Sequence, residues 1–394
     1  MTPALLSLGT ALPAHVLEQT DAHDLYLAQP GTDRLNVRLL RTVFGASGVV
    51  RRHTVLSELV DDDARDGSPY ITGDGRFLAP LTGVRNRTYV EEAPGLFAEA
   101  ARDALARCPE VDPASITDVV TVSCTGFFAP GPDYQLVRDL GLDPATRRSH
   151  IGFMGCHGGL IGLRQAAALA TADPDAVVLL VAVELCTLHL RPARGPDAIR
   201  GAALFADGAA AALVSSRVPD GVLPLLELDR FRTLVIPDGE QAMAWTIGDS
   251  GFEMVLGAAV PQVLEDNIHT ALQALLEGPD GTVERERITD WALHPGGRGI
   301  LDKLEHTLDL PPEALRESRD VLATRGNMSS VTVLHVLRQV IDEAPRDEER
   351  TVCALAFGPG LTVESALFTI PARPAAPAAH AVAAPTRQEI HRGP

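Results

Sequence analysis

The feature that most constrains the fold of this chain is an alternation of short β-like runs with longer helical patterns, which continues to about residue 370. Such alternation is typical of layered α/β folds, in which helices cover the faces of a sheet. The predicted strands cover 118–123, 176–183, 209–214 and 352–357, and the predicted helices cover 95–107, 134–140, 158–171, 255–276 and 330–341.

The chain also contains a faint internal repeat. The tripeptide Ile-Thr-Asp at 116–118 leads into a β-like run that ends at Cys124, and the same tripeptide at 288–290 leads into a run that ends at His294. At about 150 residues per domain, 394 residues allow two or three domains or one large α/β unit. We therefore expect two similar βαβ-containing halves, 1–218 and 219–370, followed by a disordered Ala- and Pro-rich tail, 371–394.

Composition excludes several classes of function. Hydrophobic residues make up 45% of the chain, which predicts a globular protein with a large core. The formal charge of −18 disfavours binding to nucleic acid or to anionic membrane surfaces. The five cysteines form no CxxC pair, so neither a disulfide framework nor a metal site is expected. With no signal peptide pattern and no long apolar run, we expect a cytoplasmic protein.

A candidate nucleophile lies in the segment GFMGCHGGL at 152–160, where Cys156 precedes a helical pattern. Small neighbours allow a sharp turn and close approach of a ligand. The free N–H groups of a helix N-terminus favour an anion, so we expect the pKa of this thiol to be lowered from about 8.5. The alternative is a small cysteine buried beneath the helix.

Two further segments could complete a site. His294 ends the strand-like run WAL and precedes Pro-Gly-Gly, which is where α/β sheets often place active-site loops. Asn327 lies in GNMSS before an apolar helix and could donate an N–H to a developing oxyanion. The alternatives are a surface histidine and a helix cap, respectively.

Taken together, these segments resemble those of type III polyketide synthases, the chalcone synthase family with the thiolase fold, and bacterial members in particular. The resemblance covers about residues 1–370 and preserves the family's order and spacing. It implies two pseudo-repeated halves that form a five-layered αβαβα core. The matching segments are GCHGG around Cys156, ALFADGAAA around Phe205, LHPGGRGIL around His294, RGNMSSVTVL around Asn327 and FGPGLTVE around Pro359.

The resemblance also implies roles for individual residues. Cys156 carries the starter and the growing chain, His294 holds its thiolate as an ion pair, and Asn327 joins His294 in stabilising the thioester oxygen and the malonyl-derived enolate. Phe205 is the gate beside the thiolate. The substrate-binding residues implied are Phe205, Cys124, Thr125, Cys186, Trp245, Met254, Ser329, Pro359 and Arg298.

Several of these positions differ from the plant pattern. Cys124 and Cys186 stand where plant enzymes have threonines. Cysteines at both places resemble bacterial members such as tetrahydroxynaphthalene synthase, in which the first can assist malonyl priming; the alternative is that both fill small apolar space. Trp245 replaces a glycine and should shorten the cavity, since one tryptophan buries about 150–250 Å². Met254 replaces a gating phenylalanine. The plant residues that bind CoA phosphates are not reproduced. Arg38, Arg41, Arg51 and Arg52 supply positive charge in that region instead, and each either meets the pantetheine-side phosphates or belongs to a solvent-exposed arginine face.

Three hypotheses follow. The first is decarboxylative condensation of malonyl-CoA onto an acyl-CoA starter, or a starter on an acyl carrier protein, followed by cyclisation to a small aromatic or pyrone product. The second is a single condensation of the ketoacyl-carrier-protein synthase III type, and the third is a catalytically silent partner subunit. The resemblance implies a homodimer and no metal or organic cofactor.

Overall fold

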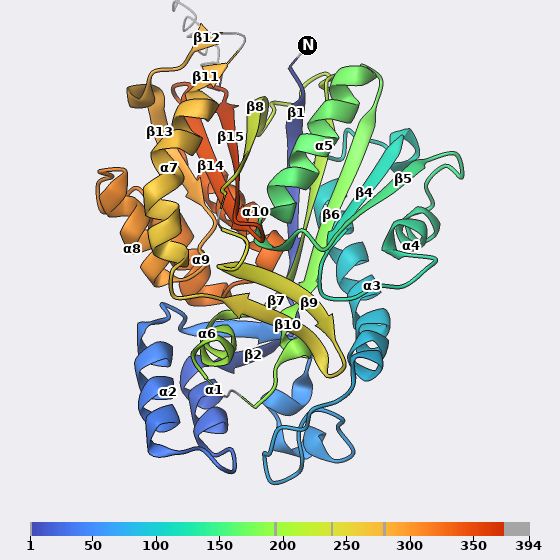
Figure 1. Cartoon of the computed structure of the whole chain (residues 1–394). Helices are drawn as coiled ribbons and strands as arrows, with labels where there is room; N and C mark the ends of the chain where they lie inside the picture. Colours follow the sequence, from blue (N-terminus) through green and yellow to red (C-terminus); the bar gives the residue numbers. More distant parts are fainter. Residues whose placement is uncertain (1, 193–194, 238, 279–280, 374–394) are drawn as a thin grey trace, which may run out of the picture.

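A computed structural model describes residues 2–192, 195–237, 239–278 and 281–373. Its centre is one mixed sheet of nine strands in the order β13-β14-β15-β8-β1-β7-β6-β4-β5 (Figure 1). The strands are β1 (Ala4–Ala11), β4 (Asp118–Ser123), β5 (Arg147–Gly152), β6 (Val177–Leu185), β7 (Asp207–Ser215), β8 (Leu226–Val235), β13 (Ile288–Leu293), β14 (Arg350–Gly358) and β15 (Thr362–Ile370).

The sheet consists of two half-sheets that meet at one narrow junction. Only Ala4 and Leu5 of β1 pair with Glu227 and Leu226 of β8. In the first half-sheet β4 pairs in parallel with β5 and β6, and in the second β13 pairs in parallel with β14. The β1–β7–β6 and β8–β15–β14 pairings are antiparallel in both halves, so the topology repeats.

Alternation along the strands builds the layers. In β6, Leu179 and Val181 pack toward α3 (Thr82–Ala106), while Leu180 packs toward α5 (Gly158–Ala172). In β14, alternate residues face the same central layer, which α5 shares with α10 (Thr332–Glu343). The opposite face of β14 packs against α7 (Val260–Leu276) and α8 (Arg298–Thr307). Helices and half-sheets therefore alternate in the predicted αβαβα order, with successive side chains on opposite faces of each strand.

Several further elements cover one end of this core. The hairpin of β9 (Met243–Gly248) and β10 (Gly251–Leu256) crosses the molecule below the half-sheets in Figure 1, with α1, α2 and α6 beneath it. The other described elements are α1 (Gln19–Leu27), α2 (Arg34–Ala46), α4 (Pro132–Asp139), α6 (Pro196–Leu204), α9 (Arg316–Arg325), β2 (His15–Glu18), β3 (Arg51–Thr54), β11 (Glu277–Gly278), β12 (Gly281–Thr282) and the short 3₁₀ turns η1 (Ser57–Leu59), η2 (Asp62–Arg65), η3 (Pro113–Ser115), η4 (Gly155–His157), η5 (Cys186–His189), η6 (Arg285–Arg287) and η7 (Ser329–Val331).

One predicted helix begins too early. The range 255–276 was expected to be helical, but Val255 and Leu256 end β10 and the helix starts at Val260. The predicted helix 95–107 is the second half of α3, which continues through Pro94. The domain boundaries at 218 and 370 stay predictions, and the predicted tail lies outside the described residues from 374 onward.

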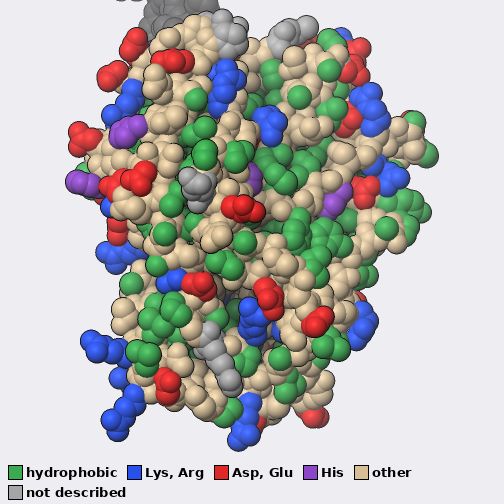
Figure 2. Space-filling model, viewed as in Figure 1, with side chains coloured by type: hydrophobic (Ala, Val, Ile, Leu, Met, Phe, Trp, Pro, Cys, Tyr) green, Lys and Arg blue, Asp and Glu red, His purple; other side chains and the backbone are tan. Residues whose placement is uncertain are grey.

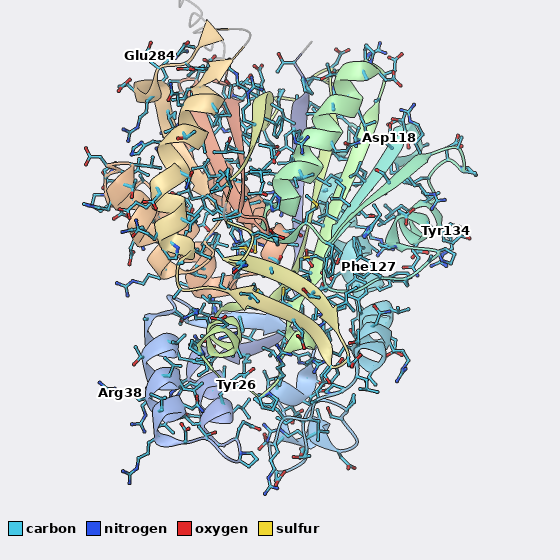
Figure 3. The ribbon with its side chains drawn as sticks, viewed as in Figure 1. Tyr26, Arg38, Asp118, Phe127, Tyr134 and Glu284 are labelled. Atoms are coloured by element: carbon cyan, nitrogen blue, oxygen red, sulfur yellow. The ribbon has the colours of Figure 1, made fainter. Side chains whose placement is uncertain are left out.

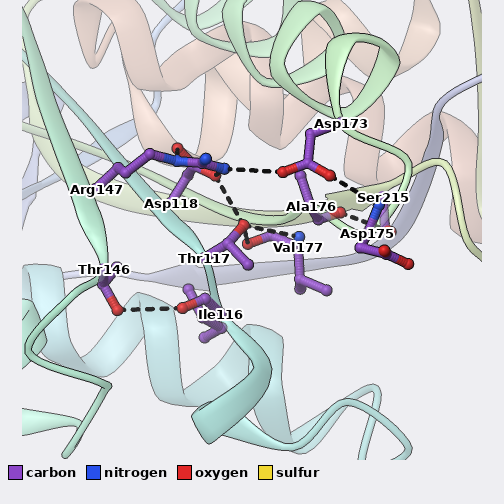
Figure 4. Close-up of polar contacts among 10 residues, drawn as sticks. All are labelled: Ile116, Thr117, Asp118, Thr146, Arg147, Asp173, Asp175, Ala176, Val177 and Ser215. Atoms are coloured by element: carbon purple, nitrogen blue, oxygen red, sulfur yellow. Dashed lines mark hydrogen bonds and ion pairs between the residues drawn. The ribbon is translucent and has the colours of Figure 1, made fainter.

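Polar contacts tie together the amino ends of β4, β5 and β6, at the opposite ends of these strands from the cysteine-bearing loops (Figure 4). Arg147 of β5 donates to both oxygens of Asp118 of β4, at 2.8 and 2.7 Å. The Thr117 hydroxyl accepts from the N–H of Val177 in β6 at 3.1 Å. These contacts hold the register of β4, β5 and β6, so that their carboxyl ends meet at the opposite edge.

Candidate active site

Residues from both halves converge where the parallel strands end. Cys124 follows β4, and Cys156 follows β5 in the turn η4. In the second half, His294 follows β13 and Pro359 follows β14. The carboxyl ends of parallel strands are where open α/β sheets form their sites, so the topology itself brings these loops together.

The loops enclose a small cavity of about 30 Å³. Eight of the nine predicted substrate-binding residues line it together with Cys156, whereas Arg298 does not. The sequence reasoning missed Gly155, Met243 and Ala244, which complete the lining. The predicted residues that line it are Phe205, Cys124, Thr125, Cys186, Trp245, Met254, Ser329 and Pro359.

Close backbone packing holds the Cys156 loop against the second half. Gly155 has φ of 73°, and a Cβ there would lie 2.7 Å from Cδ of Pro359. A Cβ on Gly159, in the first turn of α5, would lie 2.3 Å from the carbonyl oxygen of Ser330. Any larger side chain at either position would push the nucleophile loop away from its partners.

The expected lowering of the pKa of Cys156 is wrong for this thiol considered alone. Cys156 is partly exposed within the cavity, yet the protein packed around its sulfur raises its pKa to about 12. Hydrogen bonds from the side chains of Ser329 and Asn327 lower it and only partly offset burial. The desolvation of a lone thiolate therefore outweighs the helix N-terminus here.

Asn327 is held so that its amide N–H₂ can face the sulfur. Its Oδ1 accepts from the N–H of Ser329 at 2.9 Å, which leaves Nδ2 as the free end of the side chain. The backbone of Asn327 pairs with Phe205 in an isolated parallel bridge. Ser329 itself has φ of 48°, a left-handed conformation that turns the chain sharply beneath the cavity.

His294, which follows β13, is only 1% exposed. Burial lowers its pKa to about 3, and the nearby His157, next to Cys156, adds to the effect. Among the described residues, neither Nδ1 nor Nε2 of His294 has a hydrogen-bond partner. Unpaired buried polar atoms are rare, and a role toward a ligand or a bound water accounts for them.

Two family models together match almost all of the described residues. Residues 2–218 match the N-terminal domain of chalcone and stilbene synthases, and residues 227–371 match their C-terminal domain. The chain belongs to the type III polyketide synthase family. It is therefore an enzyme, an acyltransferase that condenses malonyl-CoA, and members of the family use malonyl-CoA and acyl-CoA as substrates.

Individual relatives support this assignment. The polyketide synthase is 36% identical over 380 residues to type III polyketide synthase 21 of Oryza sativa, with 92% of each chain covered. It is 32% identical over 378 residues to type III polyketide synthase C of Arabidopsis thaliana, with 92% of this chain and 94% of that protein covered.

Solved structures show the same fold. The C-terminal type III polyketide synthase domain of Steely1 from Dictyostelium superposes with a TM-score of 0.83 at 26% identity, over 94% of this chain and 99% of that one. The polyketide synthase PKS-I of the brown alga Ectocarpus siliculosus superposes with a TM-score of 0.84 at 27% identity, over 93% and 98%. The predicted thiolase-like fold is thereby confirmed.

Arg298 of this polyketide synthase lies in a second, larger cavity of about 350 Å³. That cavity runs between α2, α6 and the start of α8, and Leu204 lines it while the next residue, Phe205, lines the smaller cavity. Arg298 forms an ion pair with Asp302 at 3.4 Å. Arg52, considered above as a source of exposed charge, is only 1% exposed, so that reading of Arg52 is wrong.

Sequence reasoning missed a buried carboxyl beneath the cavity. Glu184 is fully buried, accepts from the thiol of Cys124 at 3.1 Å and from the hydroxyl of Thr125 at 2.9 Å, and also accepts from Ser330. Burial raises the pKa of the Glu184 carboxyl. The sequence signal for Glu184 was weak, since it consists only of a place near the end of an apolar strand, two residues before the predicted pocket residue Cys186.

His189 was missed as well. Its Nε2–H donates to the carbonyl of Thr125 at 2.8 Å, and its Nδ1 accepts the N–H of Phe252 at 3.0 Å. Its ring stacks on Phe252 at 4.3 Å and meets Trp245 edge-on. His189 therefore supports the hairpin wall of the cavity.

Among the described residues, no group of three or more His, Cys, Asp or Glu side chains is arranged to hold a metal ion, and none of the described helices is long and apolar enough to cross a membrane.

Proposed function

We propose that Cys156 is the nucleophile of a decarboxylative condensation, with His294 as its proton acceptor and Asn327 as an oxyanion donor. The observation that carries this proposal is that the side chains of Asn327 and Ser329 lie close enough to the Cys156 sulfur to lower its pKa, at the small cavity that Cys156 lines. Donors around a sulfur favour its anionic form. His294, with both ring nitrogens free among the described residues, is the group that can take the proton.

The charge of such a pair is balanced within the site. Burial opposes a lone thiolate and a lone imidazolium, as the shifted pKa values of Cys156 and His294 show. Transfer of the proton from sulfur to imidazole creates both charges together, and their attraction offsets part of the desolvation of each. The thiolate then attacks the thioester carbonyl of the starter, the new bond from sulfur to the acyl carbon replaces the bond to CoA, and the departing CoA thiolate takes the proton from the imidazolium of His294.

Extension then follows by loss of carbon dioxide. The malonyl thioester loses its carboxylate as CO2, and the electron pair moves into an enolate whose oxygen accepts hydrogen bonds from His294 and Asn327. The enolate carbon attacks the acyl group on Cys156, the C–S bond breaks, and the sulfur regains its negative charge. Phe205 offers an apolar face beside the sulfur that disfavours the malonyl carboxylate and so favours its loss. These steps use thiol, imidazole and carboxamide groups, and we propose that no metal or organic cofactor takes part.

We propose that the pantetheine arm enters through the larger cavity. Leu204 and Phe205 are adjacent and line the larger and the smaller cavity, respectively. Arg200 and Arg298 lie on the lining of the larger cavity, where they could meet CoA phosphates. Arg38 on α2 is exposed and extends from the same side of the molecule (Figure 3), so it could also meet the phosphates or an acidic carrier protein.

The size of the smaller cavity favours short products. Its volume of about 30 Å³ is less than a tenth of the volume of about 350 Å³ of the larger cavity. A third cavity, of about 60 Å³, lies next to the smaller one, and Trp245 lines both of these. We propose that Trp245 limits chain length and that the product is a small aromatic or pyrone ring.

We propose that two copies of the chain pair through the edge strand β5. This strand ends the sheet, and among the described strands it pairs only with β4. Apolar side chains gather over this side of the molecule (Figure 2). Tyr134 of α4, labelled in Figure 3, is 44% exposed, and Met154, which follows β5, is 38% exposed. Sedimentation analysis of the wild type and of a Tyr134→Asp, Met154→Asp variant should show a dimer and a monomer, whereas a monomeric wild type would contradict the proposal.

Mass spectrometry of products formed from malonyl-CoA with a panel of acyl-CoA starters tests the proposed reaction. Several malonyl extensions per product are expected for the wild type, against one for a ketoacyl-synthase-like reaction. Cys156→Ala should abolish product but keep some CO2 release from malonyl-CoA, because His294 and Asn327 still stabilise the enolate. Product formation by this variant at the wild-type level would refute the assignment.

A further inference from the structure

Arg52 is a buried cation with no acidic partner. It lies in β3 and is 1% exposed, and in the described part of the chain the acceptors of its hydrogen bonds are all neutral. Burial lowers its pKa to about 10, so the guanidinium stays protonated at neutral pH. An unpaired buried charge is costly unless hydrogen bonds satisfy it. Its hydrogen-bond partners therefore indicate what it does.

Those partners are the side-chain oxygen of Gln19 and carbonyl groups at the C-terminal end of α6. The last four carbonyls of a helix, here 201–204, have no partner within the helix. The first accepts the N–H of Phe205 at 3.1 Å. The next two, of Ala202 and Ala203, accept from the Arg52 guanidinium at 2.6 and 3.1 Å, and the carbonyl of Phe205 accepts from it at 3.1 Å.

The fourth carbonyl is paired with the second half of the chain. The carbonyl of Leu204 accepts the N–H of Asn327 at 2.9 Å, and the N–H of Ala206 donates back to the carbonyl of Asn327 at 2.9 Å. These two bonds flank Phe205, which forms the parallel bridge with Asn327. The end of α6 therefore has two closures, one by Arg52 and one by Asn327.

Arg52 also touches the loop that carries Asn327. A Cβ on Gly326 would lie 3.2 Å from the Cβ of Arg52 and 3.1 Å from the carbonyl oxygen of Leu204. The left-handed φ of 73° at Gly326 lets the chain pass between them. Any displacement of Arg52 would therefore act on both segments at once.

We propose that Arg52 is a positioning residue that sets the places of Phe205 and Asn327 by closing the end of α6. The proposal rests on the proposed function, which gives these two residues their roles. A guanidinium suits this place because its planar fork can donate to several carbonyls together, and because a cation is favoured at a helix C-terminus. Lysine would keep the charge but satisfy fewer carbonyls.

The test compares Arg52→Met and Arg52→Lys with a matched control. Arg230 also donates to carbonyls at a helix C-terminus, those of Leu275 and Leu276 in α7, at 3.0 and 2.7 Å, but lines neither the smaller nor the larger cavity. For each variant we would measure kcat and KM for CO2 release from malonyl-CoA, the alkylation rate of Cys156, the unfolding temperature, and amide hydrogen exchange in 196–207 and 324–330.

Arg52→Met should lower kcat for CO2 release by about 10- to 100-fold, the size of effect seen when an oxyanion donor is misplaced. We expect KM and Cys156 alkylation to change by less than about threefold, faster exchange in both segments, and an intermediate kcat for Arg52→Lys. Arg230→Met should lower the unfolding temperature without changing kcat. Should Arg52→Met fail to fold, Gln19→Leu removes the acceptor of Arg52 and should act in the same direction, by about three- to tenfold.

Wild-type kcat and unchanged exchange in the Arg52 variants would overturn the positioning role. So would an equal fall in CO2 release and in Cys156 alkylation, because this would indicate general loss of structure. A wild-type protein that released no CO2 would instead refute the proposed function, and the exchange rates of 196–207 and 324–330 would still decide the structural part.

Discussion

Replacement of His294 by alanine tests whether this imidazole holds the proton of Cys156. Burial, only partly offset by the side chains of Ser329 and Asn327, raises the pKa of the sulfur to about 12, and in His294→Ala no imidazole is left to take its proton. At pH 8 a thiol with that pKa is only about 1 part in 10⁴ thiolate, against about a quarter for an ordinary cysteine. With His294 in place, the sulfur and the imidazole can ionise as a pair at a far lower pH.

The assay is alkylation of Cys156 by iodoacetamide between pH 5 and pH 10, followed by mass spectrometry of the modified peptide. The wild-type rate should be nearly flat above about pH 6 to 7, because the thiolate is already formed there. For His294→Ala we expect a rate that rises about tenfold per pH unit and that is about 10- to 100-fold lower at pH 8, since the greater nucleophilicity of a more basic thiolate offsets part of its scarcity.

His306→Ala is the matched control, because His306 is exposed at the end of α8 and lines neither the smaller nor the larger cavity. It should reproduce the wild-type profile. If the wild type itself showed a tenfold rise per pH unit with no plateau, or if His294→Ala kept the plateau, the ion pair between Cys156 and His294 would be refuted.

Three further perturbations give separable outcomes. Trp245→Gly should join the two cavities that Trp245 lines and yield longer products, and an unchanged product mass profile would contradict its role as the wall. Gly358→Ala would place a Cβ 1.6 Å from Nδ1 of His157, so the η4 turn must move; CO2 release should fall at least about tenfold and the free energy of unfolding by about 1–3 kcal/mol. The pKa of His335 is lowered by burial to about 3, so the unfolded chain binds one more proton between that pH and about 6.5, and stability is lost as the pH falls through this window. The free energy of unfolding, measured by urea titration, should fall less steeply with pH in His335→Gln than in the wild type, by about 1.4 kcal/mol per pH unit between pH 6 and 4.

Local sequence predicted the elements whose signal is contained in a few consecutive residues. The apolar run at 118–123 has the same bounds as β4, and the predicted helix 158–171 differs from α5 by one residue. The helix predicted from residue 255 was wrong at its start, because the short apolar strand β10 runs directly into the apolar pattern of α7. Periodicity cannot separate two adjoining apolar segments of this length.

The residues of the candidate site likewise fall into those that local sequence could identify and those that it could not. The glycine-bearing loops around Cys156, His294 and Asn327 could be recognised from the sequence, since each carries its residues within a few positions. Glu184 and His189 could not, because a single charged or polar residue after an apolar strand has the same local pattern whether it reaches solvent or a cavity. Their partners come from segments far away in the chain.

The order of residues along this chain therefore determined the layered class, the repeat of two halves and the identity of the three groups proposed for catalysis. Only the packed structure decided that the thiol of Cys156 is costly to ionise alone, that Trp245 stands between two cavities, and that Arg52 lies inside the protein. The physical reason is that the free energy of a charge depends on the water and the donors around it, and those are set by neighbours that the chain brings together only on folding.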